Sequence, residues 1–201
     1  EIAQCLVGSE MCIRDSCLMI MTNKAFYEFV MELNRDANFQ RCLPITDRKA
    51  DEQYRVELLL RLLITQSVDW DSINNYSDFS ELLDKETICL CRADLDTDDI
   101  RERFVSTFQL LYGVLGEDSF KKYSGQKRLG PVMAAVFQII ATGVFKNIND
   151  IISLPNRDEW LLEKANSVFE TDEYKRNTTP GIKSIPRYKD LSLFSMEYFK
   201  V

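Results

Sequence analysis

The sequence predicts an all-α fold, and two patterns support this prediction. Apolar residues recur three and four positions apart through most of the chain, which is the spacing of one helix face, whereas the alternation typical of strands is almost absent. The polar connectors between the periodic segments are short. With 201 residues, 45% of them hydrophobic, the chain can bury one core of its own. We therefore predict a single multi-helix globular bundle of roughly six to eight helices.

The first periodic segment spans Asn23 to Asp36 and predicts an amphipathic helix. Thr22 or Asn23 can cap its start, because short polar side chains accept hydrogen bonds from the free N–H groups of a first turn. A short second turn follows and ends at Pro44, whose ring does not fit a helix interior. The apolar residues of these two segments are Phe26, Phe29, Val30, Leu33, Phe39 and Leu43.

The strongest helical pattern runs from Ala50 to Gln66 and is apolar on nearly every side, which predicts a central helix. Glu57 and Arg61 lie on it four positions apart with the glutamate first, the favoured order for an ion pair on one face. Two interpretations stay open. The pair either lies on the helix surface or is a partly buried structural ion pair that determines how neighbouring helices pack.

Two further helices are predicted in the middle of the chain. Ser77 or Asp78 caps the first. The stretch Thr87–Cys91 has the composition of a strand but no partner run, so we assign it to a helix end or a loop. The second helix begins in the acidic stretch Asp96–Asp99, which suits the positive end of a helix dipole, and ends at Gly116. The acidic stretch lacks the glycine and closing glutamate of a calcium loop.

The C-terminal half continues the helical pattern, with short interruptions at proline and glycine. The predicted elements there are a polar connector over 116–130, an apolar helix opening at Pro131, a short turn starting at Asn149 or Asp150, a helix over Arg157–Phe169, a loop over 178–184 and a last helix over Pro186–Lys200.

Composition limits the chemistry of this chain. The net charge is -7 and there is no histidine, the side chain that most often transfers protons near neutral pH. No glycine-rich nucleotide loop, zinc motif or nucleophile elbow is present, so we assign no catalytic, cofactor-binding or metal-binding residue. No apolar run reaches the length of a membrane span, and we predict a cytoplasmic protein without membrane contact.

The cysteines do not form a recognisable site. Cys17, Cys42, Cys89 and Cys91 lack the paired spacing of zinc ligands. We predict reduced, mostly buried thiols.

Two basic clusters stand out against the negative net charge. They comprise Lys121, Lys122, Lys127 and Arg128 in the polar connector, and Lys183, Arg187 and Lys189 at the start of the last helix. Each is expected to be a solvated helix end. The first cluster is also the candidate nucleic-acid contact, although the net charge opposes a broad phosphate-binding surface.

The stretch Glu1–Ser16 has neither a helical nor a strand period, and it resembles a translated sequencing adapter. One frame of the index adapter used in transposase-based libraries fits it at every fixed position, with Ala3 and Gln4 at the variable index. A signal peptide is excluded because charged residues occupy the place of its apolar core. We therefore assign residues 1–16 as adapter-derived and residues 17–201 as a single helical domain, a fragment of a larger protein.

A series of hydrophobic motifs carries a family resemblance. In order, the motifs are Phe26, Phe29, Val30 and Leu33; Asn38 and Phe39; Glu57–Leu63; Tyr76, Phe79, Leu82 and Leu83; and Leu115, Gly116 and Phe120. Their order and spacing resemble the helical part of the domain-of-unknown-function 262 group, the ParB/sulfiredoxin-like nuclease proteins that include the GmrSD-type restriction endonucleases. The resemblance runs from about Phe26 to Ile148 and continues more weakly to the end.

The resemblance implies that the chain is the C-terminal helical part of a prokaryotic, nucleotide-dependent nuclease that serves restriction or anti-phage defence. The family's catalytic centre lies upstream, around an Asp-Gly-Gln-Gln-Arg motif on a mixed sheet. This chain lacks that motif, so no catalytic residue is carried over. A nucleotide and a divalent metal would belong to the parent protein. The implied partners are the missing N-terminal sheet domain, a second copy of the chain, and DNA bound only through the intact protein.

Two alternatives stay open. The chain is either a free-standing helical protein-interaction domain without enzymatic activity, or a helical nucleic-acid binder that works through the basic connector from Lys121 to Arg128.

Overall fold

Nine α-helices make up most of the described residues, which confirms the predicted all-α fold. The computed structural model describes residues 19, 22–46 and 54–201. The helices are α2 (Lys24–Asn34), α3 (Ala37–Cys42), α5 (Tyr54–Ile64), α6 (Phe79–Arg92), α7 (Thr97–Leu115), α8 (Ala134–Ile151), α9 (Arg157–Ser167), α10 (Asp172–Asn177) and α11 (Ser184–Tyr198). Short 3-10 turns are η1 (Ile73–Asn75), η2 (Gly116–Asp118) and η3 (Val168–Glu170).

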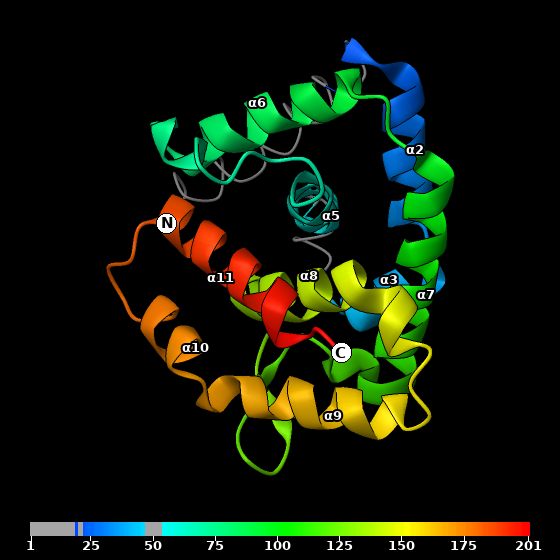
Figure 1. The fold of residues 1–201 in the computed structure, drawn as a ribbon, viewed down its shortest axis with the longest axis vertical. Helices are drawn as coiled ribbons and strands as arrows, with labels where there is room; N and C mark the ends of the chain where they lie inside the picture. The colour runs from blue at the N-terminus through cyan, green and yellow to red at the C-terminus, as the bar shows by residue number, and fades with distance from the viewer. Residues whose placement is uncertain (1–18, 20–21, 47–53) are drawn as a thin grey trace.

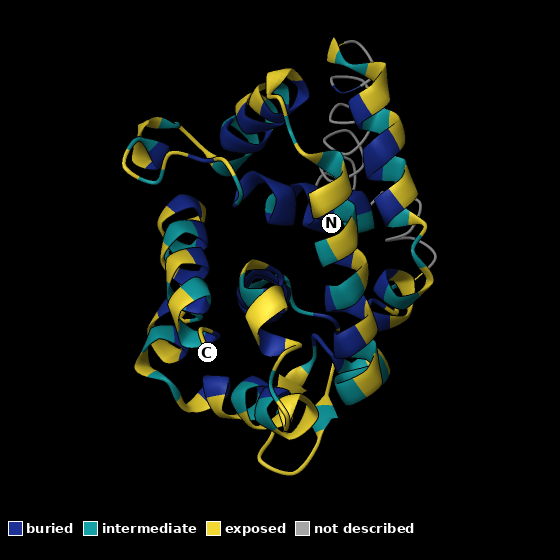
Figure 2. Ribbon diagram, turned by 45° about the vertical axis from the view of Figure 1, so that its right-hand side comes forward, coloured by how far each residue is buried: buried dark blue, intermediate teal, exposed yellow. Residues whose placement is uncertain are grey.

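Helix α5 occupies the centre of the fold. Figure 1 shows it end-on, with α6 on one side, α2 and α7 on another, and α8 and α11 below. It contacts α2, α6 and α8, and eight of its residues are buried. The neighbouring helices therefore cover the leucines that occur on all sides of α5. The outer helices instead carry stripes of buried and exposed positions (Figure 2).

The predicted helix starts agree with the structure where polar caps mark them. The side chains of Asn23, Asp78 and Asp96 each accept a hydrogen bond from the backbone N–H three residues on. Gly116 ends α7 with φ of 61°, a conformation that side chains disfavour. The stretch Thr87–Cys91 continues α6 to Arg92, so of its two predicted assignments the helix end is the observed one.

The connector after α7 contains more structure than predicted. β1 (Lys122–Tyr123) pairs antiparallel with β2 (Arg128–Leu129), and Gly125 lies in the turn with φ of 90°. The backbone N–H of Met133 donates to the carbonyl of Phe120 at 3.0 Å, which keeps the chain extended past Pro131. Helix α8 therefore begins at Ala134 and not at Pro131 as predicted.

Two other predictions about the C-terminal half are corrected. Asn149 and Asp150 do not start a separate turn, because they form the last turn of α8. Helix α10 was not predicted, since six residues are too short to show a helical period. It is capped by Thr171, whose hydroxyl accepts from the backbone N–H of Tyr174 at 3.3 Å.

The longest interface joins α8 to α11, and it is unusually close at Gly143. A Cβ atom added there would lie 2.6 Å from the carbonyl oxygen of Ser195 and 2.9 Å from Cγ of Phe199. Only glycine permits this approach of the two backbones. The ring of Phe199 thereby fills the space next to α8 and is fully buried.

Candidate functional site

The predicted Glu57–Arg61 ion pair forms on α5 and is partly buried. The Glu57 side chain is 9% exposed and that of Arg61 22%. The Phe79 ring of α6 lies 4.4 Å from Cζ of Arg61, in cation–π geometry. From α11, the hydroxyl of Tyr188 donates to the carbonyl of Arg61 at 2.7 Å. The pair thus lies where α5, α6 and α11 meet, as in the partly buried interpretation.

The four basic residues of the predicted connector lie in different environments. Lys121 pairs with Asp118 at 2.6 Å. Lys122 and Lys127 are exposed. Of the four predicted nucleic-acid contacts, these two lysines are therefore the exposed ones. A nucleic-acid function of the connector stays a prediction that rests on them.

Arg128, the fourth member of that cluster, is held in place by hydrogen bonds to the protein. Its guanidinium donates to the carbonyls of Ser119 at 3.0 Å and Ala165 at 2.7 Å, and to Oδ1 of Asn166 at 3.1 Å. Burial lowers the pKa of Arg128 to about 10. Arg128 therefore links the β-hairpin to the end of α9.

A cavity lined by two arginines lies next to the ion pair. It has a volume of about 250 Å³ and is bordered by α5, α6, α8 and α11. We call it the arginine cavity; its lining residues are Arg61, Phe79, Ala134, Ala135, Gln138, Ser184, Arg187, Tyr188 and Leu191.

The polar groups of the arginine cavity are only partly satisfied by the protein. The Nε atoms of Arg61 and Arg187 are buried and have no hydrogen-bond partner. One terminal nitrogen of Arg187 donates to the carbonyl of Ile182 at 3.2 Å. The buried Gln138 directs Nε2 inward, to Ser192 Oγ at 2.8 Å and Thr142 Oγ1 at 3.1 Å. Unsatisfied N–H groups of a cation favour an anionic partner.

The sequence patterns do not predict this cavity. They place Arg187 in a basic cluster and Arg61 in an ion pair, and they assign Gln138 and Tyr188 to no site. A signal was present, since the starts of α8 and α11 have no acidic residue in the first turn. The missing acidic residues indicate a site only because both helix starts lie beside one cavity.

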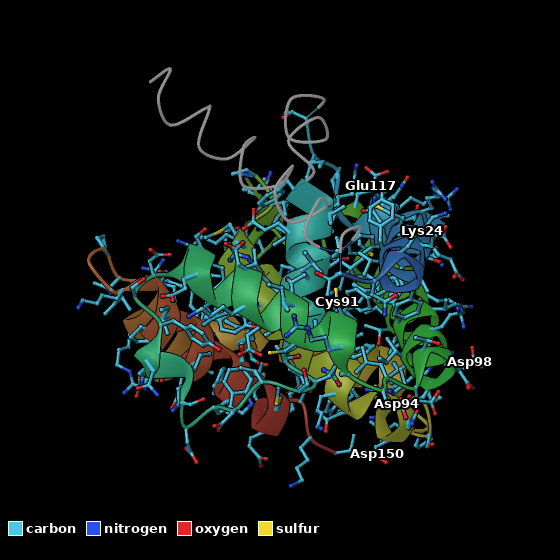
Figure 3. All side chains as sticks on the ribbon, turned by 90° about the horizontal axis from the view of Figure 1, so that it is seen from above. Lys24, Cys91, Asp94, Asp98, Glu117 and Asp150 are labelled. Atoms are coloured by element: carbon cyan, nitrogen blue, oxygen red, sulfur yellow. The ribbon has the colours of Figure 1, made fainter. Side chains whose placement is uncertain are left out.

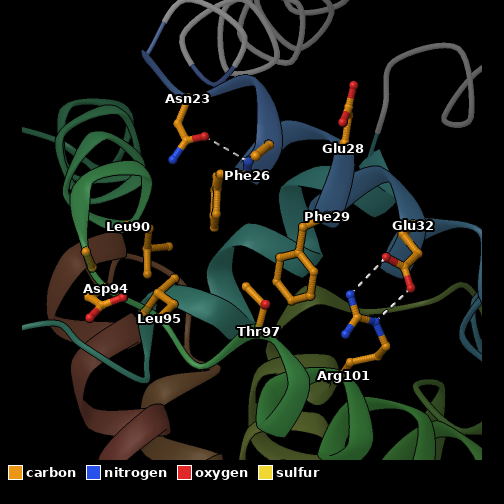
Figure 4. A pocket seen from close by; sticks show the side chains of 12 residues that line it. Asn23, Phe26, Glu28, Phe29, Glu32, Leu90, Asp94, Leu95, Thr97 and Arg101 are labelled. Carbon is orange, nitrogen blue, oxygen red and sulfur yellow. Dashed lines mark hydrogen bonds and ion pairs between the residues drawn. The ribbon is translucent and has the colours of Figure 1, made fainter.

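A second cavity, shown in Figure 4, is a groove between α2, the end of α6 and the start of α7, with a volume of about 410 Å³. We call it the α2–α7 groove. Its apolar lining includes Phe26, Phe29, Leu90 and Leu95, and its rim carries Glu28, Glu32, Asp94 and Arg101.

One cation of the groove is already paired. Arg101 donates to both carboxylate oxygens of Glu32, at 2.8 and 3.2 Å, and to Asp98 at 2.5 Å. The hydrogen bond from Arg101 lowers the pKa of Glu32. Figure 3 shows Asp98 at the edge of the molecule, and Figure 4 shows Asp94 across the groove from Glu32. The rim of the α2–α7 groove is therefore acidic.

The thiols differ in exposure. Cys42 and Cys91 are buried, whereas Cys89 is exposed, so the prediction of mostly buried thiols is wrong for Cys89. Burial raises the pKa of Cys42 to about 12 and that of Cys91 to about 11. Cys17 lies outside the described residues. Of the described cysteines, Cys89 is the accessible thiol.

Within residues 19, 22–46 and 54–201, no three side chains of histidine, cysteine, aspartate or glutamate group as metal ligands would. None of the helices in these ranges is both long and apolar enough to cross a bilayer. No family model, curated protein or solved structure matches the chain.

Proposed function

We propose that the chain is the helical part of a GmrSD-like, ParB-like nuclease-family protein of the prokaryotic cytoplasm. In this role it braces an upstream sheet domain that holds the catalytic motif. The parent protein would cleave foreign DNA in a restriction or anti-phage system, with its own nucleotide and divalent metal. A second copy of the chain is a further partner that the resemblance implies.

The observation that supports this proposal is the place of the motif residues in the core. Phe26, Phe29, Val30, Leu33 and Phe39 are all buried, and so are the leucines from Leu58 to Leu63. They join α2, α3 and α5 into one packed unit. Motif residues that pack together in one core are expected when the segment that carries them folds as one domain.

Sequencing the gene through its 5′ region from an independent library tests the proposal. We expect an in-frame sheet domain with Asp-Gly-Gln-Gln-Arg upstream of Cys17. The extended protein should cleave DNA in a nucleotide-dependent way, and alanine at the aspartate of that motif should abolish cleavage. The chain of 201 residues alone should show no turnover. A start codon at Met19 or Met21 with no such domain before it would overturn the proposal.

The α2–α7 groove favours a second function, that of a free-standing helical interaction domain. An apolar floor with an acidic rim is complementary to a basic amphipathic helix. Under this hypothesis a peptide with a lysine- or arginine-rich face binds the full chain, and Glu28→Lys together with Asp94→Lys weakens binding at least about tenfold, since each like-charge contact is unfavourable. The same peptide should bind unchanged to a variant with Asp150→Lys, an exposed position on α8 outside the groove.

A further inference from the structure

Helices α8 and α11 lie side by side and point in the same direction (Figure 1). Gln138 hydrogen-bonds to Ser192 at 2.8 Å, and Asn147 further along α8 donates to the carbonyl of Met196 at 2.9 Å. Because the residue numbers of the contacts rise together, the two N-termini lie at one end of the pair. The partial positive charges of two helix dipoles therefore add at that end.

Neither of these helix starts is neutralised by the protein. The residues that precede them, Met133 and Lys183, make no side-chain cap, and neither first turn contains an acid. In contrast, α6, α7, α9 and α10 each carry aspartate or glutamate in the first turn. Among the helices whose preceding residue is described, α8 and α11 are the two that lack both a side-chain cap and an acid. The backbone N–H groups of Ala134 and Ala135 in α8, and of Ser184 and Ile185 in α11, therefore have no side-chain cap, whereas Pro186 in the first turn of α11 has no N–H.

The arginine cavity opens on this end of the helix pair. Ala134 and Ala135 from the first turn of α8 line it, and so does Ser184 from the first turn of α11. Both helices are long, 18 and 15 residues, so each contributes its full dipole. The first turns of two different helices therefore line the cavity.

The same cavity holds an excess of positive charge from side chains. Glu57 pairs with Arg61, but no carboxylate in the described ranges forms an ion pair with Arg187. Arg187 lies in the second turn of α11, where a cation interacts unfavourably with the dipole. The Nε atoms of both arginines lack partners but are inaccessible to solvent, so an anion in the cavity would meet the terminal nitrogens of the two guanidinium groups and the first turns of the two helices.

We propose that the arginine cavity binds a phosphoryl group, either of inorganic phosphate or at the end of a nucleotide. Helix N-termini and arginine forks are the two protein groups that most often recognise phosphate oxygens. The volume of about 250 Å³ admits one phosphoryl group, and it lies below the roughly 300–1,000 Å³ of pockets that enclose a whole drug-sized ligand. The body of a nucleotide would therefore remain outside. This inference does not depend on the nuclease resemblance.

Titration of the full chain with inorganic phosphate at constant ionic strength tests the proposal, followed by backbone amide NMR and thermal unfolding. We expect the amide resonances of Ala135, Ser184 and Ile185 to shift and the unfolding midpoint to rise with phosphate concentration, since a ligand that binds only the folded state stabilises it. ATP in place of phosphate distinguishes the two sources. Tighter binding of ATP indicates a nucleotide, and tighter binding of phosphate indicates the free ion.

Two variants and a control complete the design. Arg187→Gln should weaken phosphate binding at least about tenfold, because one of the two forks is lost. Ala135→Glu should abolish binding and raise the phosphate-free unfolding midpoint, since its carboxylate supplies the missing anion to the helix start. Lys146→Gln removes one positive charge from an exposed position at the other end of α8 and should leave phosphate binding unchanged.

Three results would overturn the proposal. The first is a phosphate response of the variants Arg187→Gln and Ala135→Glu that equals the response of the parent chain. The second is a set of shifts confined to the exposed Lys122 and Lys127 of the hairpin. The third is acetate matching phosphate in affinity, because that result would indicate charge screening without recognition of a phosphoryl group.

Discussion

Arg61 combines a charge, a cation–π contact and a backbone acceptor at one position. Arg61→Ala leaves the 9% exposed Glu57 without its cation. Breaking a fully buried pair costs about 3–5 kcal/mol, and breaking an exposed pair under about 1 kcal/mol. We expect Arg61→Ala to lower the free energy of unfolding by more than roughly 2 kcal/mol, and Arg61→Leu by less, because leucine restores part of the packing.

Denaturant unfolding of both variants measures these values, and the exposed pair of Lys24 and Glu28 provides the matched control. These side chains are 78% and 64% exposed, at 3.5 Å and with the same four-residue spacing. Lys24→Ala should change the free energy of unfolding by under about 0.5 kcal/mol. If Arg61→Ala behaves like Lys24→Ala, the pair has no structural role.

The cysteines provide a second prediction at the residue scale. Cys89 is exposed, whereas Cys42 and Cys91 are buried with raised pKa values. Alkylation of the native protein near pH 8 should therefore label Cys89 at least about tenfold faster than the other two, since the thiolate is the reactive form. Fragment mass spectrometry separates Cys89 from Cys91. Equal labelling of Cys42 and Cys89 would contradict the described burial.

The sign of the pH effect on Cys42 follows from its raised pKa. An unfolded chain loses this thiol proton near pH 9.0, and the folded chain retains it to about pH 12. The contribution of Cys42 to stability is therefore complete below pH 9 and is lost as the pH rises toward 12. Cys42→Ala should flatten the fall of the unfolding free energy across this window. An unchanged pH profile would show that Cys42 does not contribute to it.

At the scale of the elements, the close contact of α8 and α11 gives the clearest prediction. Alanine usually stabilises a helix interior relative to glycine by about 0.5–1 kcal/mol. At Gly143 the new methyl group would lie 2.6 Å from a backbone oxygen that cannot move freely. We expect Gly143→Ala to destabilise the protein by at least about 2 kcal/mol. Gly113→Ala on α7, where nothing lies within 4 Å of the added Cβ, should be neutral or stabilising. Thermal unfolding of the two variants is compared directly.

The hairpin depends on Arg128 for its attachment to α9. Lysine at this position keeps the charge but cannot reproduce the fork that contacts Ser119, Ala165 and Asn166 together. Arg128→Lys should lower the free energy of unfolding by about 2 kcal/mol or more. Arg176→Lys on α10, at an exposed position, serves as the control and should have no measurable effect. Equal behaviour of the two variants would show that the fork contributes nothing.

For the whole molecule, the adapter resemblance makes a prediction about residues 1–16, which lie outside the described residues. A sequence that was never selected as part of a protein is not expected to stabilise one. Deleting residues 1–16 should leave the thermal midpoint unchanged within error. A fall of several degrees would count against the adapter assignment, because it corresponds to about 1 kcal/mol or more.

The fold could be predicted from the sequence where helices are long and capped. The apolar period predicts α2, α5 and α7, and polar side chains at Asn23 and Asp96 mark the starts of α2 and α7. Short elements such as α10 and the hairpin could not be predicted, because two to six residues carry no period.

The arginine cavity could not be predicted for a different reason. Arg61, Gln138 and Arg187 are far apart in the chain, and only the packing of α5, α8 and α11 brings them to one cavity. Sequence patterns describe local faces. They do not report which helix ends meet in three dimensions.

The packing of α11 onto α8 has a consequence for biosynthesis. The face of α8 that carries Gln138 and Gly143 packs against α11, which the ribosome makes later. At about 5–20 residues per second, the roughly fifty residues from the end of α8 to Phe199 take about 2.5–10 s to translate. Throughout that interval the surface of α8 around Gly143, which the buried Phe199 later covers, is exposed. We expect nascent chains halted before Ser184 to aggregate or to be held by chaperones, whereas chains completed through Phe199 fold in solution.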